Sequence, residues 1–221
     1  MTKIPEGLDY INKPQDYYEN IRPEMLAYLP STAKVVLDVG CSSGHFGFAI
    51  KQKAKAEVWG IEPFERFGKL AVNKLDKVFI SSVEAALQDL PDKYFDVIFF
   101  NDVLEHLLDP YSVLEKIKGK LKDDGKIISS IPNIRYFRNF FELLFKGEWD
   151  YTDEGILDRT HVRFFTKKSI AKMYENAGYS IESHDGINGS KSIKPLIFNV
   201  LLGFKGMDMK YTQFATVAHK K

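Results

Sequence analysis

The sequence lacks the features that mark several classes of protein. It has one cysteine, Cys41, so an intramolecular disulfide framework is excluded. Its longest apolar stretch, around Pro195 to Phe204, is far shorter than the ~20 residues of a membrane-spanning helix. The first ten residues lack the apolar core of a signal peptide. With no repeat and no linker rich in Pro, Gly or Ser, we expect one cytoplasmic domain over residues 1–221, without stable membrane insertion.

The chain also lacks an excess of charge. Its 31 Lys and Arg face 30 Asp and Glu, which leaves a formal net charge of +1. A protein that holds nucleic acid by neutralising phosphates needs a basic excess. We therefore expect a small-molecule partner and no nucleic acid, while the apolar segment 193–204 leaves a homodimer open.

Short apolar runs alternate with amphipathic segments along the chain. The predicted strands are residues 33–37, 57–61, 78–80, 96–100, 126–131, 179–185 and 211–219. The predicted helices are residues 44–53, 64–75, 110–121, 136–146 and 167–176, with Gly125 as a C-cap and Thr166 as an N-cap. Strands that alternate with helices indicate an α/β fold, a Rossmann-like and mostly parallel sheet with helices on both faces.

A turn of small residues, Asp38 to Gly44 (DVGCSSG), follows the first predicted strand. Such a turn lets the backbone approach a ligand, and the helix behind it presents free N–H groups. Neither a P-loop nor a dinucleotide fingerprint fits, because His45 follows Gly44 and Ser42 replaces the middle glycine. Asp38 would repel a pyrophosphate but suits the amino group and sulfonium of S-adenosyl-L-methionine. Glu62, at the end of the second strand, can accept hydrogen bonds from both ribose hydroxyls.

Three motifs in order, VLDVGCSSGHFG, IEPFE and FDVIFFNDVLEHLLDP, together resemble the class I S-adenosylmethionine-dependent methyltransferases, in the small-molecule and ubiquinone-type O-methyltransferase branch. The resemblance runs from about Tyr17 to Tyr179. It implies a seven-stranded sheet with an antiparallel last strand. It also implies methyl transfer to a small-molecule acceptor, most often to an oxygen of a sugar, a quinone-like compound or a lipid-linked precursor. The alternative is a cofactor-binding module without catalysis that serves as an assembly or regulatory partner.

The resemblance also assigns contacts with S-adenosyl-L-methionine to particular residues. These are Asp38, Gly40, Cys41, Gly44, Glu62, Pro63, Ser82, Val83, Glu84 and Asn101. Two positions depart from the family pattern, since Ser42 replaces a glycine and Ser82 replaces the commoner aspartate near the adenine. Cys41 sits inside the turn, where being small is its expected role.

The candidate catalytic residues are Asp102, His106 and His161. Asp102, Glu105 and His106 have the spacing at which ubiquinone-type O-methyltransferases place metal ligands, but a histidine suits Mg²⁺ poorly, and we assign no metal. Glu105 and His106 could instead orient the loop, or His106 could act as a general base. His161 lies in a polar segment, DRTHVRFFT, where it would face the acceptor.

Three further segments complete the expected organisation. Residues 1–30 resemble the N-terminal helix of these enzymes, in which Tyr18 or Arg22 could reach the cofactor carboxylate. Residues 132–165 carry seven aromatic side chains within sixteen positions and form either a substrate lid or ordinary core. Residues 188–208 form an apolar insertion before the last strand.

Overall fold

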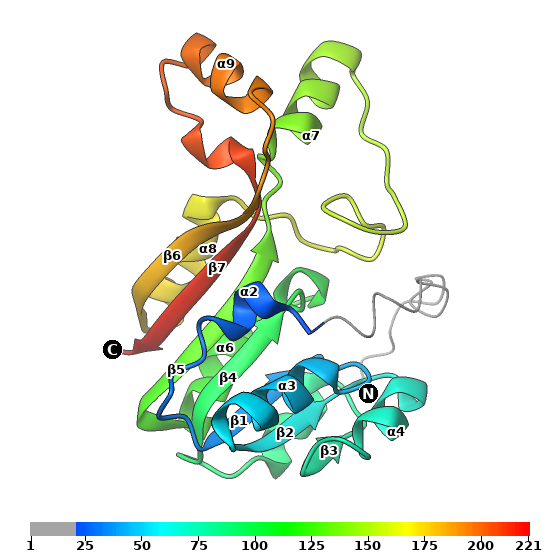
Figure 1. Cartoon of the computed structure of the whole chain (residues 1–221), viewed down its shortest axis with the longest axis vertical. Coiled ribbons are helices and arrows are strands. Elements are labelled where there is room, and N and C mark those ends of the chain that lie inside the picture. The colour runs from blue at the N-terminus through cyan, green and yellow to red at the C-terminus, as the bar shows by residue number, and fades with distance from the viewer. Residues whose placement is uncertain (1–20) are drawn as a thin grey trace.

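Seven strands form one sheet in the order β3-β2-β1-β4-β5-β7-β6 (Figure 1). The structure is a computed structural model and describes residues 21–221. The strands are β1 (Val35–Val39), β2 (Glu57–Ile61), β3 (Lys77–Phe79), β4 (Phe95–Asn101), β5 (Leu121–Pro132), β6 (Tyr179–Gly189) and β7 (Tyr211–Lys220). The first five pair in parallel, and β7 runs antiparallel to both β5 and β6. The predicted fold is confirmed, including its antiparallel last strand.

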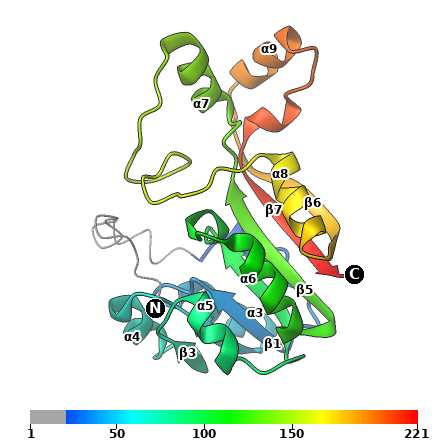
Figure 2. The same cartoon turned by 180° about the vertical axis from the view of Figure 1, so that it is seen from behind.

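Helices cover both faces of this sheet (Figures 1 and 2). They are α2 (Pro23–Leu26), α3 (His45–Ala54), α4 (Glu65–Ala71), α5 (Val83–Ala86), α6 (Pro110–Ile117) and α8 (Lys167–Asn176), whereas α7 (Phe137–Phe141) and α9 (Lys194–Leu201) lie beyond the sheet. The core of one face joins α2, α3 and α4 to the sheet, and the core of the other joins α5, α6 and α8. Neighbouring residues of β4 serve different cores, as Phe99 and Phe100 do, because side chains alternate along a strand.

The predicted C-cap at Gly125 is wrong. The helix α6 ends at Ile117, a short 3₁₀ turn follows, and β5 already begins at Leu121. Gly125 lies inside β5, where an added Cβ would stand 2.9 Å from the carbonyl oxygen of Phe95. Pairing with β4 through a bulge draws this stretch into the sheet, and tertiary pairing overrides the local signal of the glycine.

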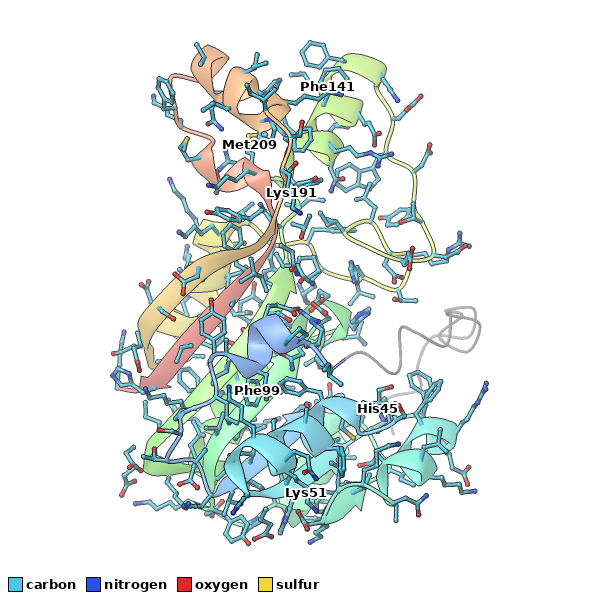
Figure 3. All side chains as sticks on the ribbon, in the orientation of Figure 1. His45, Lys51, Phe99, Phe141, Lys191 and Met209 are labelled. Carbon is cyan, nitrogen blue, oxygen red and sulfur yellow. The ribbon has the colours of Figure 1, made fainter. Side chains whose placement is uncertain are left out.

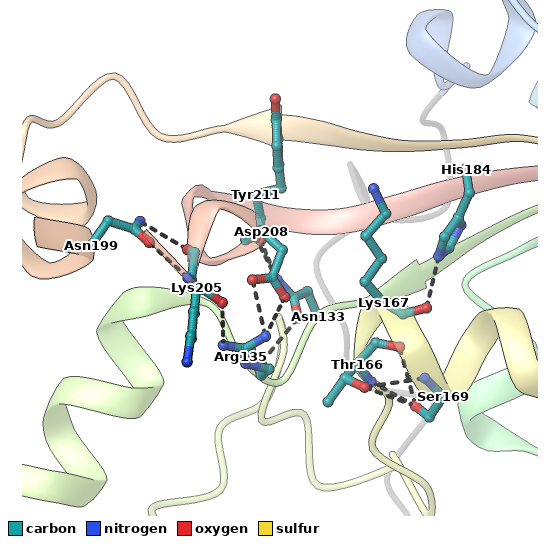
Figure 4. Close-up of polar contacts among 11 residues, drawn as sticks. Asn133, Arg135, Thr166, Lys167, Ser169, His184, Asn199, Lys205, Asp208 and Tyr211 are labelled. Carbon is teal, nitrogen blue, oxygen red and sulfur yellow. Dashed lines mark hydrogen bonds and ion pairs between the residues drawn. The ribbon is translucent and has the colours of Figure 1, made fainter. Parts of the chain in front are cut away.

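The predicted N-cap at Thr166 is confirmed. Its hydroxyl accepts a hydrogen bond from the N–H of Ser169 at 3.2 Å, and the Ser169 hydroxyl accepts one from the N–H of Thr166 at 2.8 Å (Figure 4). This reciprocal pair satisfies two N–H groups that a helix start leaves without partners.

Two insertions stand together beyond the carboxyl end of β5 (Figures 1 and 2). The first contains α7 and a π-helical turn, Glu142–Lys146, and the second contains α9. The chain then returns from the first insertion to the sheet through residues 147–165. Across residues 21–221, every helix is too short or too polar to cross a bilayer.

The packing predicts a large loss of stability for Phe99→Ala. The Phe99 ring is fully buried and meets Phe46 of α3 edge to face, with ring centroids 5.1 Å apart (Figure 3). Removing a buried phenylalanine ring should lower the free energy of unfolding by about 3–5 kcal/mol in urea titrations. The exposed Leu70→Ala is the control and should change it by less than about 0.5 kcal/mol. Equal effects of the two variants would contradict this account of the core.

Candidate functional site

The strand order places a candidate site at the carboxyl ends of β1 and β4. From β1 the chain proceeds outward to β2 and β3, and it then returns to β4 on the other side of β1. Ligands of open α/β sheets bind in the crevice at such a reversal. The turn after β1 and the segment after β4 therefore meet where a ligand is expected.

The turn after β1 depends on three residues with left-handed backbone. Gly40, Ser42 and Gly44 have φ values of 72°, 49° and 81°. A Cβ on Gly40 would lie 2.5 Å from Val103 Cγ2, and one on Gly44 would lie 3.1 Å from the Cα of Ala71. Glycine is therefore required at both positions by the backbone and by the neighbours.

Glu62 ties this turn to the end of β2. Its carboxylate accepts the N–H of Ser42 at 2.9 Å and the N–H of Phe64 at 3.0 Å. Burial raises the pKa of Glu62 to about 7, although the two N–H groups oppose that shift. Each carboxylate oxygen has a second lone pair, so the same group can also accept from ribose hydroxyls.

Asp38 is the second buried acid of the turn. Burial, and then the nearby charge of Glu62, raise the pKa of Asp38 to about 8. Cys41 lies beside both acids, and burial followed by their charges raises the pKa of its thiol, so the thiol stays protonated. Its sulfur occupies the space of a side chain at Gly60, where a Cβ would come within 2.5 Å. Cys41 thus packs against Gly60, and its contact with the cofactor stays a prediction.

Unpartnered polar atoms mark the same place. Within residues 21–221, Asp38 Oδ2, the hydroxyl of Ser42 and both polar atoms of the Asn101 side chain are buried without a hydrogen bond. Buried polar groups are normally paired, so these atoms fit a ligand with an amino group and several hydrogen-bonding groups. The residues present therefore suit S-adenosyl-L-methionine, with Asp38 toward its amino group and Glu62 toward its ribose.

The other expected cofactor contacts have varied surroundings. The Ser82 hydroxyl caps α5 by accepting the N–H of Ala85 at 3.4 Å, and Val83 is buried in the core. Pro63 and Glu84 are exposed. These positions stay predictions, and Val83 already has a packing role.

Asp102 lies in a network that the sequence did not reveal. It forms an ion pair with Arg22 and accepts hydrogen bonds from Ser130 Oγ at 3.2 Å and Gln213 Nε2 at 2.6 Å. Arg22 also donates to Ser130 at 3.1 Å and to Gln213 at 3.2 Å. Arg22 was expected to reach the cofactor carboxylate, and Tyr18, the alternative, lies outside the described residues. With these three donors, Asp102 holds the start of the described chain against the sheet.

His106 and His161 come together, although the sequence treated them as separate candidates. Their ring centroids are 4.6 Å apart. Nδ1 of His106 lies 3.0 Å from the carbonyl oxygen of Thr160, and Nδ1 of His161 lies 3.0 Å from that of Ile156. A nitrogen that faces a carbonyl must carry the proton, so Nε2 is the basic nitrogen of each neutral ring.

Glu105 lies beneath this histidine pair. Its carboxylate oxygen Oε1 is 3.9 Å from Nε2 of His161, and its side chain is 1% exposed. Burial, and then the charge of Asp102, raise the pKa of Glu105 well above the usual carboxyl range. The carbonyl oxygen of Glu105 accepts the N–H groups of Val162 and Arg163, each at 3.1 Å, which fixes the loop that carries His161.

The structure also changes the set of residues that could hold a metal. One ligand atom from each of Glu105, His106 and His161 lies within 4.8 Å of the others. Asp102, which the sequence grouped with Glu105 and His106, belongs to the network with Arg22 instead. Two histidines and a carboxylate are ligands for zinc or iron rather than for Mg²⁺.

Aromatic side chains of the 147–165 segment gather beside His161. The Phe164 ring centroid lies 6.4 Å from that of His161, 5.6 Å from Trp149 and 6.2 Å from Tyr151. The concentration of aromatic residues in the sequence was the signal for this cluster. It forms an apolar wall next to the histidine pair.

The fold and the cofactor turn are those of class I methyltransferases, and comparison with known proteins agrees. Residues 11–184 match the methyltransferase domain family, and the chain belongs to that family. A crystal structure of a SAM dependent methyltransferase from Archaeoglobus fulgidus superposes with a TM-score of 0.66 at 20% identity, covering 93% of this chain and 97% of that one. The predicted family, its cofactor S-adenosyl-L-methionine and its fold are thereby confirmed.

Two relatives differ in the acceptors that their names state. The ubiquinone biosynthesis O-methyltransferase of Aeromonas salmonicida is 27% identical over 190 residues, which cover 80% of this chain and 74% of that protein. The tRNA U34 carboxymethyltransferase of Nautilia profundicola is 33% identical over 100 residues, which cover 43% of this chain and 33% of that protein. The chain thus spans about a third of the length of this second relative.

The raised pKa of Asp38 predicts a pH dependence that Asp38→Asn removes. The folded protein keeps this proton up to about pH 8, whereas an unfolded chain loses it near 3.8. The stabilising contribution of this group is therefore present at low pH and is lost as the pH rises toward 8. Between about pH 5 and pH 8 the melting temperature of the ligand-free wild type should fall more than that of Asp38→Asn.

The same ionisation should govern cofactor binding. An ionised Asp38 attracts the amino group of S-adenosylhomocysteine, so calorimetric affinity should fall by up to about tenfold per pH unit below pH 8. The Asp38→Asn variant should bind S-adenosylhomocysteine weakly. Its affinity should also lack the pH dependence that ionisation of Asp38 causes in the wild type. A wild-type affinity that stays constant over this range would show that Asp38 does not face the amino group.

Proposed function

We propose that the protein transfers the methyl group of S-adenosyl-L-methionine to an oxygen of a small-molecule acceptor bound between the end of β4 and residues 147–165. One observation carries this proposal. The rings of His106 and His161 lie 4.6 Å apart beside the buried carboxyl group of Glu105, and Glu105 and His106 follow a few residues after Asn101, where β4 ends. The arrangement supplies a base next to the cofactor turn. The proposal includes both the contacts of the turn after β1 with the cofactor and the catalytic role of the two histidines.

The cofactor supplies an activated methyl group, so the protein's main tasks are to align the acceptor and to remove its proton. Thr160 and Ile156 hold the Nδ1 protons of the two histidines and thereby orient Nε2 as the proton acceptor. Oε1 of Glu105 lies 3.9 Å from Nε2 of His161, so a proton taken by His161 would favour ionisation of this buried acid, whose pKa is otherwise raised. The wall of Phe164, Trp149 and Tyr151 limits the access of water.

The relatives support oxygen as the methylated atom without assigning the acceptor. The match to an O-methyltransferase of ubiquinone biosynthesis covers four fifths of this chain, whereas the match to the tRNA-modifying enzyme covers less than half. A quinone-like compound, a sugar or a lipid-linked precursor is the proposed acceptor class. The absence of a nucleic-acid acceptor stays a prediction, because it depends on the balanced charge alone.

Glu62→Ala tests the cofactor site. Loss of charged hydrogen bonds to the ribose should weaken the binding of S-adenosylhomocysteine by about 1–3 kcal/mol in calorimetry. The control is Glu65→Ala, which removes an exposed acid three residues away and should leave the affinity unchanged. Equal affinities of Glu62→Ala and the wild type would remove Glu62 from the site.

His106→Asn and His161→Asn test the base. Labelled methyl transfer into the small-molecule fraction of a cell extract should fall about a hundred- to ten-thousand-fold for the variant that lacks the base. That variant should also lose the acidic limb of the pH–rate profile while keeping its affinity for S-adenosylhomocysteine. The exposed His219→Asn, at the far end of β7, is the control.

The outcomes of this experiment separate the hypotheses. Transfer unchanged in both histidine variants would exclude a histidine base. A wild type that binds the cofactor but methylates nothing in any fraction would favour the non-catalytic module. Labelling confined to RNA would contradict the proposed small-molecule acceptor and would indicate a nucleic-acid acceptor.

A further inference from the structure

The two insertions form a surface that the proposed reaction does not explain. We call residues 137–146 and 193–207 the helical cap; it contains α7 with its π-helical turn and α9. Ten large apolar side chains of the cap are 45–66% exposed. They are Phe141, Leu143, Leu144, Phe145, Ile193, Leu196, Ile197, Val200, Phe204 and Met207. Such a concentration of exposed large apolar side chains in one part of a fold marks a candidate interaction site.

Hydrogen bonds and ring contacts hold the two insertions of the cap in place. Arg135 donates two hydrogen bonds to Asp208, at 2.9 and 3.0 Å (Figure 4). The buried side chain of Asn199 bonds the carbonyl oxygen of Pro195 and both backbone groups of Gly206 at 2.8–2.9 Å. These contacts fix both ends of the second insertion.

Ring contacts then join the two insertions. Phe198 of α9 meets Phe140 and Phe145 at centroid distances of 6.0 and 6.3 Å. With Phe198 and Asn199 turned inward, α9 presents Leu196, Ile197 and Val200 outward.

Every charged side chain of residues 191–207 is a lysine. Lys191 (labelled in Figure 3), Lys194 and Lys205 are exposed, and none of the three forms an ion pair among residues 21–221. The acid of the cap, Glu142, pairs with Arg138, and the acids that directly flank the cap are paired too, Asp208 with Arg135 and Glu148 with Lys146. The cap therefore combines exposed aliphatic side chains with uncompensated lysines.

We propose that the helical cap docks on an anionic lipid surface. Its outward aliphatic and aromatic side chains would enter the boundary between head groups and acyl chains, while the lysines meet the anionic head groups. A second copy of the chain fits less well, because a two-fold contact through α9 would bring Lys191 and Lys194 of both copies together. RNA also fits less well, because aliphatic side chains offer bases no stacking surface.

Docking at this place has a consequence for the acceptor. The chain runs from α7 back toward the sheet (Figure 1), and His161 lies in this returning segment, residues 147–165, so the cap and the histidine pair are joined by one short stretch of chain. An acceptor with a lipid tail in the bilayer and a hydroxyl in its head group fits this geometry. This second step rests on the proposed function, whereas docking itself does not.

Vesicle co-sedimentation of the full chain, without cofactor or acceptor, tests the docking. The protein should sediment with phosphatidylcholine vesicles that contain phosphatidylglycerol and much less with phosphatidylcholine alone, and added salt should reduce the bound fraction. Ile197→Asp with Val200→Asp should lower the partition coefficient at least about tenfold. Lys191→Glu with Lys194→Glu should lower it by about fivefold or more per lysine and flatten the salt dependence.

A matched control carries the same change at the other end of the molecule. Leu70 and Val72 are 48% and 54% exposed, so Leu70→Asp with Val72→Asp removes similar apolar surface from the region of α4. This variant should bind vesicles as the wild type does. Binding of S-adenosylhomocysteine and the melting temperature show that every variant is folded.

Three results would overturn the docking proposal. The first is no sedimentation of the wild type with anionic vesicles. The second is equal vesicle binding by the wild type and both cap variants. The third is a dimer in sedimentation velocity, or capture of an RNA oligonucleotide, that the cap substitutions abolish while vesicles have no effect. Failure of the methyl-transfer experiment would leave all three readouts intact.

Discussion

The site depends on the buried carboxylate of Glu62, which is held by the backbone N–H groups of Ser42 and Phe64. These hydrogen bonds join the turn after β1 to the chain that leaves β2. They hold Ser42 in a left-handed conformation that its side chain disfavours. They also keep Glu62 close enough to Asp38 for its charge to disfavour ionisation there. One carboxylate thus sets both the shape and the proton affinity of the turn.

Local signals in the sequence predicted the features that local forces decide. The existence and order of the strands, the turn from Asp38 to Gly44 and the Thr166 cap follow from the local sequence pattern, whereas β5 begins five residues earlier and β6 ends four residues later than predicted. Gly125 was misjudged because pairing with β4 acts over a longer range. The meeting of His106 and His161 depends on the path of a long loop, and Asp102 and Gln213 are 111 positions apart. No periodicity encodes such contacts: the sequence singled out Asp102, His106 and His161 but not Gln213.

Stability and function oppose each other at this site. Asp38 and Glu105 are buried acids whose ionisation the interior disfavours, and unpartnered polar atoms accompany them. Such groups weaken a folded protein, and they are retained where a ligand will use them. The hydrophobic cores on the two faces of the sheet supply the stability that offsets the cost of these buried acids. The helical cap lies outside both cores, so the packing of the cores does not constrain its sequence, and the proposed docking surface can do so instead.

The position of β7 has a consequence for synthesis of the protein. This strand follows β6 in the chain, yet it lies between β5 and β6 and pairs with both. While a ribosome still encloses residues 211–220, β5 therefore has an open edge and β6 has no neighbour. Open strand edges invite association with other chains. The nascent protein thus stays incomplete until translation has passed these residues, and its folding is completed by insertion of a strand rather than by growth of the sheet at its edge.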